Sequence, residues 1–352
     1  WGEGSYTFRC ERTGKYMNTR MGQSDKESSE TGWIAAEKDA PFDWFVMEIF
    51  HVLEQGNGMI QLTNRFHSPV EIDEKDFLVS MREGSAAQFR MEIVENGLEK
   101  ACSLVQGKEK VILALGCNSM INAKEEVDRT TIALPPAQEH LLEEIYRINP
   151  NVVLVLFSNY PYAINTAQEK LPAVIWSATG SQDMGTAMAE TLFGNNAPAG
   201  RLNMTWYRSD EQLPDIDDYD IIKGKRTYRY FDGDVLYPFG YGLTYSSFTY
   251  TDFSAAPEDN RKLRVSFCVT NTGDRVSDEV AQIYGTAPAS RVKKPLKQLL
   301  GFRRLKDILP GEIRKAEFMI PIDEFRFYDV ISRTMMVEEG CYRIFVGPSS
   351  AQ

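Results

Sequence analysis

A segment dense in charged side chains is the first part of this sequence that could carry chemistry. Five charged residues lie within six positions: Lys124, Glu125, Glu126, Asp128 and Arg129. They follow an apolar run, residues 111–115, which reads as a buried strand and is broken at residue 116. Open α/β sheets bind ligands at the carboxyl ends of their strands. The segment is therefore either a ligand-binding loop or a solvated crossover between two elements.

The elements that must position this segment alternate between apolar runs and helical patterns. Buried strands are predicted at residues 111–115, 152–157 and 173–176. Helices are predicted at residues 98–105, 163–168 and 184–193, and from Pro135 through residue 148. This alternation predicts a small doubly wound α/β domain over residues 98–245. The loops at 117–130, 158–162 and 177–183 would then meet at one edge of the sheet.

Two β-rich segments flank this domain. Residues 1–97 read as short strands and turns, and the pattern at 45–49 recurs at 89–93, which suggests a β-trefoil-like module. Residues 246–352 contain about seven short strands separated by turns, which predicts a fibronectin- or immunoglobulin-like sandwich. The irregular connection at 195–245 is rich in tyrosine, and we expect its rings to join neighbouring domains.

Composition excludes several classes of function. The net charge of -11 argues against nucleic acid or an anionic membrane as the main partner. The chain begins at Trp1 without a signal-peptide pattern, so we expect the native polypeptide to extend upstream. The five cysteines form no CxxC, which predicts buried free thiols in a reducing compartment, no zinc site and no other metal. No phosphate-binding glycine motif follows residue 115, so nucleotide binding has little support.

Five motifs together resemble the carboxyl-terminal half of glycoside hydrolase family 3. They are EEVDRTTIALPPAQEHL (125–141), NPNVVLVLFSNYPYAI (149–164), LFGNNAPAGRLNMTWYRS (192–209), KRTYRYFDGDVLYPFGYGLTYSSFTY (225–250) and KQLLGFRRL (297–305). The resemblance covers residues 98–352 and implies an α/β sandwich domain followed by a fibronectin III-like domain. Residues 1–97 resemble the fascin-like β insert that some bacterial members carry.

The resemblance implies a retaining β-glycosidase that acts at non-reducing ends without a cofactor. Such enzymes use two carboxyl groups about 5 Å apart. In the family, the nucleophile is an Asp on a (β/α)8 barrel, and the acid/base Glu often lies in a Glu-x-x-Asp-Arg pattern. Glu125 matches that position, and Glu126 is the runner-up. Asp128 and Arg129 are expected to pair and hold the loop.

Other implied contacts and partners lie outside this loop. Tyr160, Arg226 and Tyr228 are possible contacts to the leaving-group side of the substrate, with a structural role as the alternative. The implied partners are a β-linked glycoside and a (β/α)8 barrel, in cis or on a separate chain, with homo-oligomerisation left open. The expected location, from the free cysteines, is the bacterial cytoplasm.

The main departure from the family is that no eight-fold β/α repetition is present in this chain. We therefore expect the chain by itself to hydrolyse little or nothing. The activity implied for the complete enzyme is that of a β-glucosidase, with a β-xylosidase as the alternative. A non-catalytic carbohydrate-binding or scaffold protein built from the same modules is a further alternative.

Overall fold

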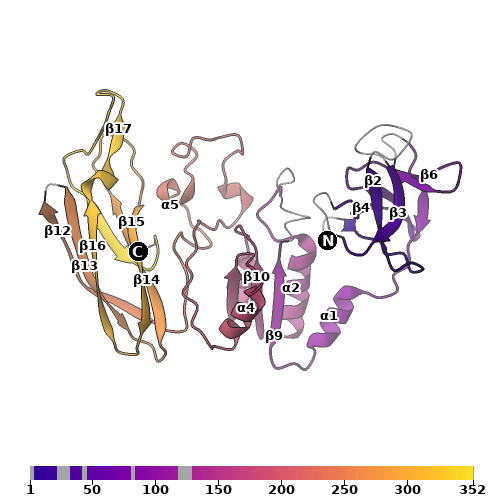
Figure 1. The fold of residues 1–352 in the computed structure, drawn as a ribbon, viewed down its shortest axis with the longest axis horizontal. Helices are drawn as coiled ribbons and strands as arrows, with labels where there is room; N and C mark the ends of the chain where they lie inside the picture. Colours follow the sequence, from indigo (N-terminus) through magenta and orange to yellow (C-terminus); the bar gives the residue numbers. More distant parts are fainter. Residues whose placement is uncertain are drawn as a thin grey trace. The chain divides into compact units, whose positions relative to one another are not determined.

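A computed structural model of the chain describes residues 4–21, 32–41, 46–80, 84–117, 129–259 and 261–351 (Figure 1). The chain divides into two compact units. The first contains residues 1–160 and 166–178, and the second contains residues 161–165 and 179–352. The domain bounds predicted at residues 97/98 and 245/246 rest on changes in the sequence pattern, and they stay a prediction.

The amino-terminal part of the first unit consists of two antiparallel sheets, with strand orders β1-β4-β5-β8 and β2-β3-β7-β6. Phe50, Ile60, Leu62 and Val70 form a buried cluster in this part of the chain. The strands are β1 Ser5–Tyr6, β2 Tyr16–Met21, β3 Gly32–Lys38, β4 Phe50–Gly56, β5 Met59–Asn64, β6 Val70–Ile72, β7 Leu78–Ser80 and β8 Gln88–Arg90.

The predicted repeat does not give two equivalent strands. The pattern at 45–49 was expected to lie in one of the short strands, but residues 46–49 form a turn that precedes β4. Val46 has a φ of 42°, and its carbonyl accepts a hydrogen bond from the Ile49 amide at 3.1 Å. At Val46 the positive φ belongs to this turn, and residues 46–49 are not paired as a strand. The strand predicted there is therefore wrong over 46–49, whereas residues 89 and 90 of the second copy lie in β8 and pair with β5.

A three-stranded parallel sheet forms the rest of the first unit. It consists of β9 Val111–Gly116, β10 Val152–Phe157 and β11 Ala173–Ser177, in the order β11-β10-β9. The three predicted strands are thereby confirmed; β10 is largely buried, whereas no residue of β11 is buried and β9 includes exposed residues. In the parallel register, Phe157 at the end of β10 lies opposite the last residue of each neighbour, Gly116 in β9 and Ser177 in β11. The carboxyl ends of all three strands therefore lie at one edge.

Two helices pack against apolar side chains of β9 and β10. Helix α1, Gly97–Val105, begins after Asn96, whose side chain accepts hydrogen bonds from the amides of two first-turn residues. Helix α2, Pro136–Ile148, begins at a proline, as its sequence predicts. Val105 and Ile145 pack with the strand residues Val111 and Val152 in one cluster, and Figure 1 shows α2 alongside β9. A short helix, α3 Asn165–Lys170, connects β10 to β11.

The main segment of the second unit, from residue 179, contains α4, Met184–Leu192, and continues into a linker, residues 195–247. The regular elements of this linker are short, namely the 3-10 helix η1 Asp210–Gln212 and helix α5 Thr227–Tyr230. Aromatic rings hold it together: Trp206 is 1% exposed and contacts Tyr237, and Tyr228 stacks on Phe239. Because Tyr228 also contacts Tyr284 of a following strand, tyrosines of the linker do join it to the next module.

That next module is a sandwich of two antiparallel sheets, β12-β13-β16 and β15-β14-β19. Its core includes Val265, Phe267, Ile283 and Ile308, each at most 1% exposed. A hairpin, β17–β18, and the 3-10 helix η2 complete it. The elements are β12 Phe248–Asp259, β13 Lys262–Asn271, β14 Ser277–Thr286, β15 Gln298–Ile308, β16 Ile313–Pro321, η2 Ile322–Phe325, β17 Phe327–Asp329, β18 Thr334–Met336 and β19 Arg343–Gly347.

A buried ion pair ties the linker to this sandwich. The Arg201 guanidinium lies 2.9 Å from the Glu279 carboxylate, and the two side chains are 8% and 3% exposed. Tyr250 of β12 donates a hydrogen bond to the same carboxylate at 2.8 Å. Burial raises the pKa of the Tyr250 hydroxyl, and the adjacent Glu279 raises this pKa further. The phenol therefore stays protonated and remains a donor to Glu279.

We expect Arg201→Met to lower the free energy of unfolding of the second unit by about 3–5 kcal/mol. The substitution leaves the Glu279 carboxylate buried without its counter-charge, which is the costly way to break a buried pair. Urea denaturation with hydrogen exchange of β14 as the local readout would measure the loss, because the chain has more than one unit.

Arg264→Met is the matched control. Arg264 pairs with Glu258 in the same sandwich, but its side chain is 46% exposed. An exposed pair contributes about 0–1 kcal/mol, so the control should change stability little. Equal losses in the two variants would contradict a special role for the buried pair.

Candidate active-site loop

The charged segment lies between β9 and α2, and we call residues 117–129 the rim loop. Glu125, Glu126 and Asp128 lie outside the described residues. Both ends of the rim loop are described, at Cys117 and Arg129. The structure shows the contacts that hold these two ends in place, and we call these contacts the frame.

Gly116 fixes the point where the chain leaves the sheet. Its φ is +143°, and a Cβ at this position would lie 1.9 Å from the Phe157 carbonyl oxygen. The Gln138 side chain clamps the same residue: it accepts from the Gly116 amide at 2.9 Å and donates to the Gly116 carbonyl at 2.7 Å. The next amide, Cys117 N–H, donates to the Phe157 carbonyl at 3.0 Å. Only glycine fits this exit from β9.

Arg129 fixes the point where the chain returns. Its guanidinium carbon lies 3.9 Å from the centre of the Tyr160 ring. The segment carrying Tyr160 is held by Ser158, whose hydroxyl donates to the Tyr160 carbonyl at 2.7 Å and accepts from Trp176 Nε1 at 3.1 Å. Since Ser158 follows β10 and Trp176 belongs to β11, the return point is tied to the ends of both strands.

This geometry brings together two of the predicted site residues, Arg129 and Tyr160, at the carboxyl edge of the sheet. A cation–π contact of this kind contributes about 0.5–2 kcal/mol, depending on its burial. The predicted pairing of Arg129 with Asp128 stays a prediction, because Asp128 lies outside the described residues. Both described ends of the rim loop, Cys117 and Arg129, therefore lie at the carboxyl edge, where an open α/β sheet binds ligands.

Arg226 and Tyr228 belong to the second unit and use their polar groups within the protein. Arg226 donates to the carbonyls of Asp215 and Asp218, with Nη2 2.9 Å from the Asp215 oxygen and Nε 3.0 Å from the Asp218 oxygen. The Tyr228 hydroxyl accepts from the Leu299 amide at 3.3 Å. Both contacts have a structural purpose, and a role of either residue in substrate binding stays a prediction.

The described parts of the chain contain no group of three or more His, Cys, Asp or Glu side chains that could hold a metal ion. All five cysteines are free thiols. Cys341 is exposed and the other four are half-buried, so the expectation that the thiols are buried is wrong. Within the described ranges, no helix is long and apolar enough to cross a membrane.

Two anchors of the rim loop had no counterpart among the predicted site residues. Gln138 was read only as part of an amphipathic helix, and Ser158 only as part of a loop after a strand. A glycine directly after an apolar strand, as at Gly116, is the sequence signal that could have indicated the close approach to Phe157. The partners of Gln138 and Ser158 depend on strand register, which the local sequence does not show.

Comparison with known families gives two matches. Residues 15–245 match the glycosyl hydrolase family 3 C-terminal domain. Residues 279–350 match the fibronectin type III-like domain. The first match covers the rim loop, the parallel sheet and most of the linker, and the second covers most of the β-sandwich.

Individual relatives fall into two groups by name. A xylan 1,4-β-xylosidase of Xylanibacter ruminicola is 38% identical over 224 residues, which are 63% of this chain and 25% of the relative. A periplasmic β-glucosidase of Salmonella typhimurium is 32% identical over 69% of this chain and 33% of the relative.

Solved structures give the same picture. The β-glucosidase of Kluyveromyces marxianus in complex with glucose superimposes with a TM-score of 0.67 at 27% identity, over 78% of this chain and 34% of that one. The chain thus spans between a quarter and about a third of the length of these three relatives.

The anchor at Gly116 predicts a large effect of a single methyl group. Gly116→Ala should destabilise the first unit by at least about 2 kcal/mol, because the new Cβ overlaps the Phe157 carbonyl at a φ that alanine avoids. Thermal or urea unfolding measures this change. Gly97→Ala is the control: Gly97 opens α1 with no atom within 4 Å of an added Cβ, so stability should change by under about 1 kcal/mol. Similar stabilities for Gly116→Ala and the parent chain would rule out the proposed close approach.

Proposed function

Because this chain belongs to glycosyl hydrolase family 3, we propose that it is the carboxyl-terminal part of a retaining β-glycosidase. In this proposal, Glu125 of the rim loop is the acid/base residue. The observation that carries it is the frame at Gly116 and Arg129, which holds both ends of the rim loop at the carboxyl edge of the parallel sheet. That edge is where an α/β domain can present a side chain to a ligand.

The proposed chemistry needs a second carboxylate from outside the described residues. In a retaining mechanism, the nucleophile attacks the anomeric carbon while Glu125 donates a proton to the leaving oxygen. Glu125 then removes a proton from the water that hydrolyses the glycosyl-enzyme. No (β/α)8 barrel is present among the elements that the structure describes, so we assign the nucleophile to a barrel in cis or on another chain. Hydrolysis is accordingly proposed for the assembled enzyme, and the chain alone should show little.

For the sugar, β-xylosides are the first candidate. The Xylanibacter ruminicola relative, at 38% identity, is named for xylan, and this observation favours a xyloside. β-Glucosides, our expectation from sequence, are the second candidate. They are favoured by the fold match to a β-glucosidase solved with glucose. The family match argues against a purely non-catalytic carbohydrate-binding or scaffold protein.

Two finer structural expectations belong to the same proposal. We propose that the amino-terminal sheets are a β-trefoil-like, fascin-like insert and that the parallel sheet with α1 and α2 is a doubly wound sandwich domain. The two four-stranded antiparallel sheets and the strand order β11-β10-β9 support these assignments. A location in a reducing bacterial cytoplasm also stays a proposal, and the five unpaired cysteines support it.

In the barrel-containing enzyme, Glu125→Ala should reduce kcat/KM on aryl glycosides with a poor leaving group by roughly 10²–10⁴-fold, because proton donation to the leaving oxygen is lost. The loss should be much smaller with a good leaving group such as 2,4-dinitrophenolate, and azide should restore turnover of that substrate. Steady-state kinetics on both substrates measures the difference.

Glu126→Gln is the matched control and should retain most of the activity on both substrates. If this variant shows the leaving-group dependence and the azide rescue instead, the acid/base role belongs to Glu126. Activity of Glu125→Ala equal to wild type on both substrates would remove Glu125 from the mechanism.

The sugar assignment predicts that kcat/KM for 4-nitrophenyl β-D-xyloside exceeds that for the β-D-glucoside. One hydroxymethyl group in a tight pocket discriminates by roughly 10–200-fold, so the preference should be clear in a direct competition assay. The α-anomers serve as the control and should not be hydrolysed. A preference for the glucoside would overturn the xyloside assignment and leave the acid/base proposal standing.

A further inference from the structure

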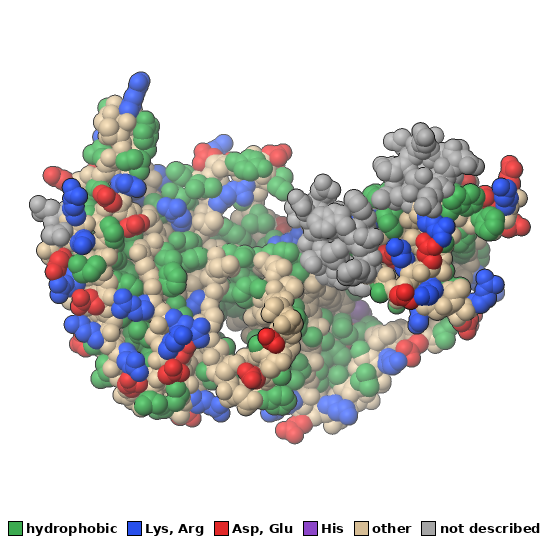
Figure 2. Space-filling view, viewed as in Figure 1, with side chains coloured by type: hydrophobic (Ala, Val, Ile, Leu, Met, Phe, Trp, Pro, Cys, Tyr) green, Lys and Arg blue, Asp and Glu red, His purple; other side chains and the backbone are tan. Residues whose placement is uncertain are grey.

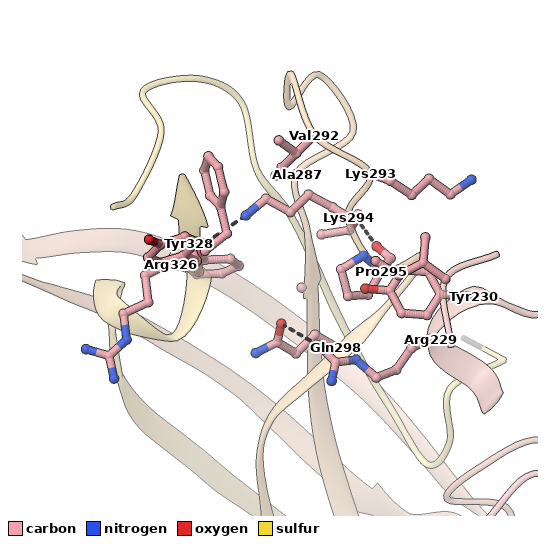
Figure 3. Close-up of a pocket in the computed structure, with 15 residues that line it drawn as sticks. Arg229, Tyr230, Ala287, Val292, Lys293, Lys294, Pro295, Gln298, Arg326 and Tyr328 are labelled. Carbon is pink, nitrogen blue, oxygen red and sulfur yellow. Dashed lines mark hydrogen bonds between the residues drawn. The ribbon is translucent and has the colours of Figure 1, made fainter. Parts of the chain in front are cut away.

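A pocket of about 290 Å³ lies within the second unit, between the linker and the β-sandwich (Figure 3). Its walls come from α5, the end of β14, the loop that follows β14, and the segment from η2 into β17. This size is at the lower end for small-molecule sites and suits a single sugar ring.

The charge of its lining sets the pocket apart from the rest of the protein. Four of its fifteen lining residues are cationic, namely Arg229, Lys293, Lys294 and Arg326, and none is Asp or Glu. The whole chain carries a net charge of -11. On the face shown in Figure 2, acidic and basic side chains are interspersed over the β-sandwich. A wall with cations alone is therefore suited to an anionic group.

Arg229 reaches the pocket with hydrogen-bonding capacity to spare. Its Nε atom is buried and has no hydrogen-bond partner among the described residues. Its Nη2 atom lies 3.5 Å from Gln298 Oε1, at the limit of a hydrogen bond. Figure 3 shows the Arg229 side chain directed at Gln298. Because Nε is closed off from solvent, an anion in the pocket would be met by the two Nη atoms, whose planar arrangement matches a carboxylate.

Lys294 supplies a second cation to the lining of the pocket. Its Nζ atom donates to the Phe325 carbonyl at 3.2 Å and lies 3.8 Å from the centre of the Phe327 ring. Burial lowers the pKa of Lys294, and the nearby Glu338 acts in the opposite direction. Glu338 accepts from Ser290 and lies 3.4 Å from Arg291, so its charge is already engaged.

Asp232, whose pKa is lowered mainly by Lys225 and to a smaller extent by Lys293, is likewise paired elsewhere. The carboxylate of Asp232 lies 3.0 Å from the Lys225 ammonium group. Figure 3 shows the side chains of Lys293 and Arg326 extending outwards from the pocket. These two exposed cations can therefore attract an anion without being needed for the fold.

Aromatic rings complete the lining. Tyr230 is 7% exposed, whereas Tyr328 is 56% exposed. The pocket thus offers aromatic faces next to hydrogen-bond donors for a carboxylate. This combination fits a ligand ring that is apolar on its faces and carries one anionic substituent. We propose that this pocket binds a uronic acid residue of an oligosaccharide, with Arg229 and Lys294 on its carboxylate and the tyrosines against the sugar. The inference rests on the proposed function, because it takes the ligand of this chain to be a glycan.

The test compares three probes in calorimetric titrations of the chain at low ionic strength: D-glucuronate, D-glucose and inorganic phosphate. Glucuronate differs from glucose by a carboxylate in place of a hydroxymethyl group. We expect glucuronate to bind at least about tenfold more tightly than glucose or phosphate, and to weaken as salt is added. Equal binding of glucuronate and glucose, or no binding of glucuronate, would overturn the proposal. Phosphate binding as tight as that of glucuronate would show an anion site without a sugar contribution and would overturn it as well.

Variants place the binding in this pocket. Arg229→Gln should weaken glucuronate binding about tenfold or more with an unchanged thermal midpoint. Arg326→Ala, at an exposed position that cannot unfold the pocket, should weaken it several-fold. Lys306→Ala is the control for net charge: this lysine is exposed on β15 and is not among the lining residues, so its removal should leave the affinity unchanged.

Two outcomes would locate the binding elsewhere. One is unchanged affinity in both Arg326→Ala and Arg229→Gln, and the other is an equal loss of affinity in Lys306→Ala. Because these titrations need no hydrolysis, they can fail or succeed independently of the Glu125 assay.

Discussion

The buried ion pair between Arg201 and Glu279 is the interaction on which the second unit depends most. A 53-residue linker with little regular structure must be held against a β-sandwich, and at Arg201 the two are joined by charges that water hardly reaches. Such a pair adds little net stability over an apolar replacement, but it excludes arrangements in which either charge is buried alone. Tyr250 accounts for a further oxygen of the carboxylate. The linker that carries α5 and part of the cationic pocket thereby has one defined position on the sandwich.

In the first unit, the corresponding constraint is the shared end of three parallel strands. Parallel pairing aligns Gly116, Phe157 and Ser177 at one edge, so the loops that follow must emerge together. The side chain of Gln138 and the ring of Tyr160 then fix the two ends of one such loop. The sheet and these two contacts therefore fix where the chain leaves this edge and where it returns.

Strong apolar periodicity is what made parts of this fold predictable. The run at 152–157 became β10 residue for residue, and Pro135-Pro136 marked the start of α2. Strands β12 and β15 were not predicted as such. Both are edge strands, and residues 251–258 of β12 are exposed, so neither shows the alternation of a half-buried strand.

The contacts of Ser158 and Trp176 could not be predicted either, because they join neighbouring strands whose register is set by tertiary pairing. Glu125 was selected because its motif resembles that of a known family. The local pattern of charges alone does not distinguish it from its charged neighbours.

The anchoring of the rim loop also bears on entropy. Bringing the two ends of a chain segment together has a free-energy cost that depends on its length, and residues 118–128 form an eleven-residue segment between anchored neighbours. Here that cost is met when the domain folds, through the Gly116 clamp and the Arg129 contact. A partner domain or substrate that contacts this segment need not supply the free energy of loop closure. Variation in the length or composition of the segment should then alter the affinity of assembly more gently than loss of either anchor.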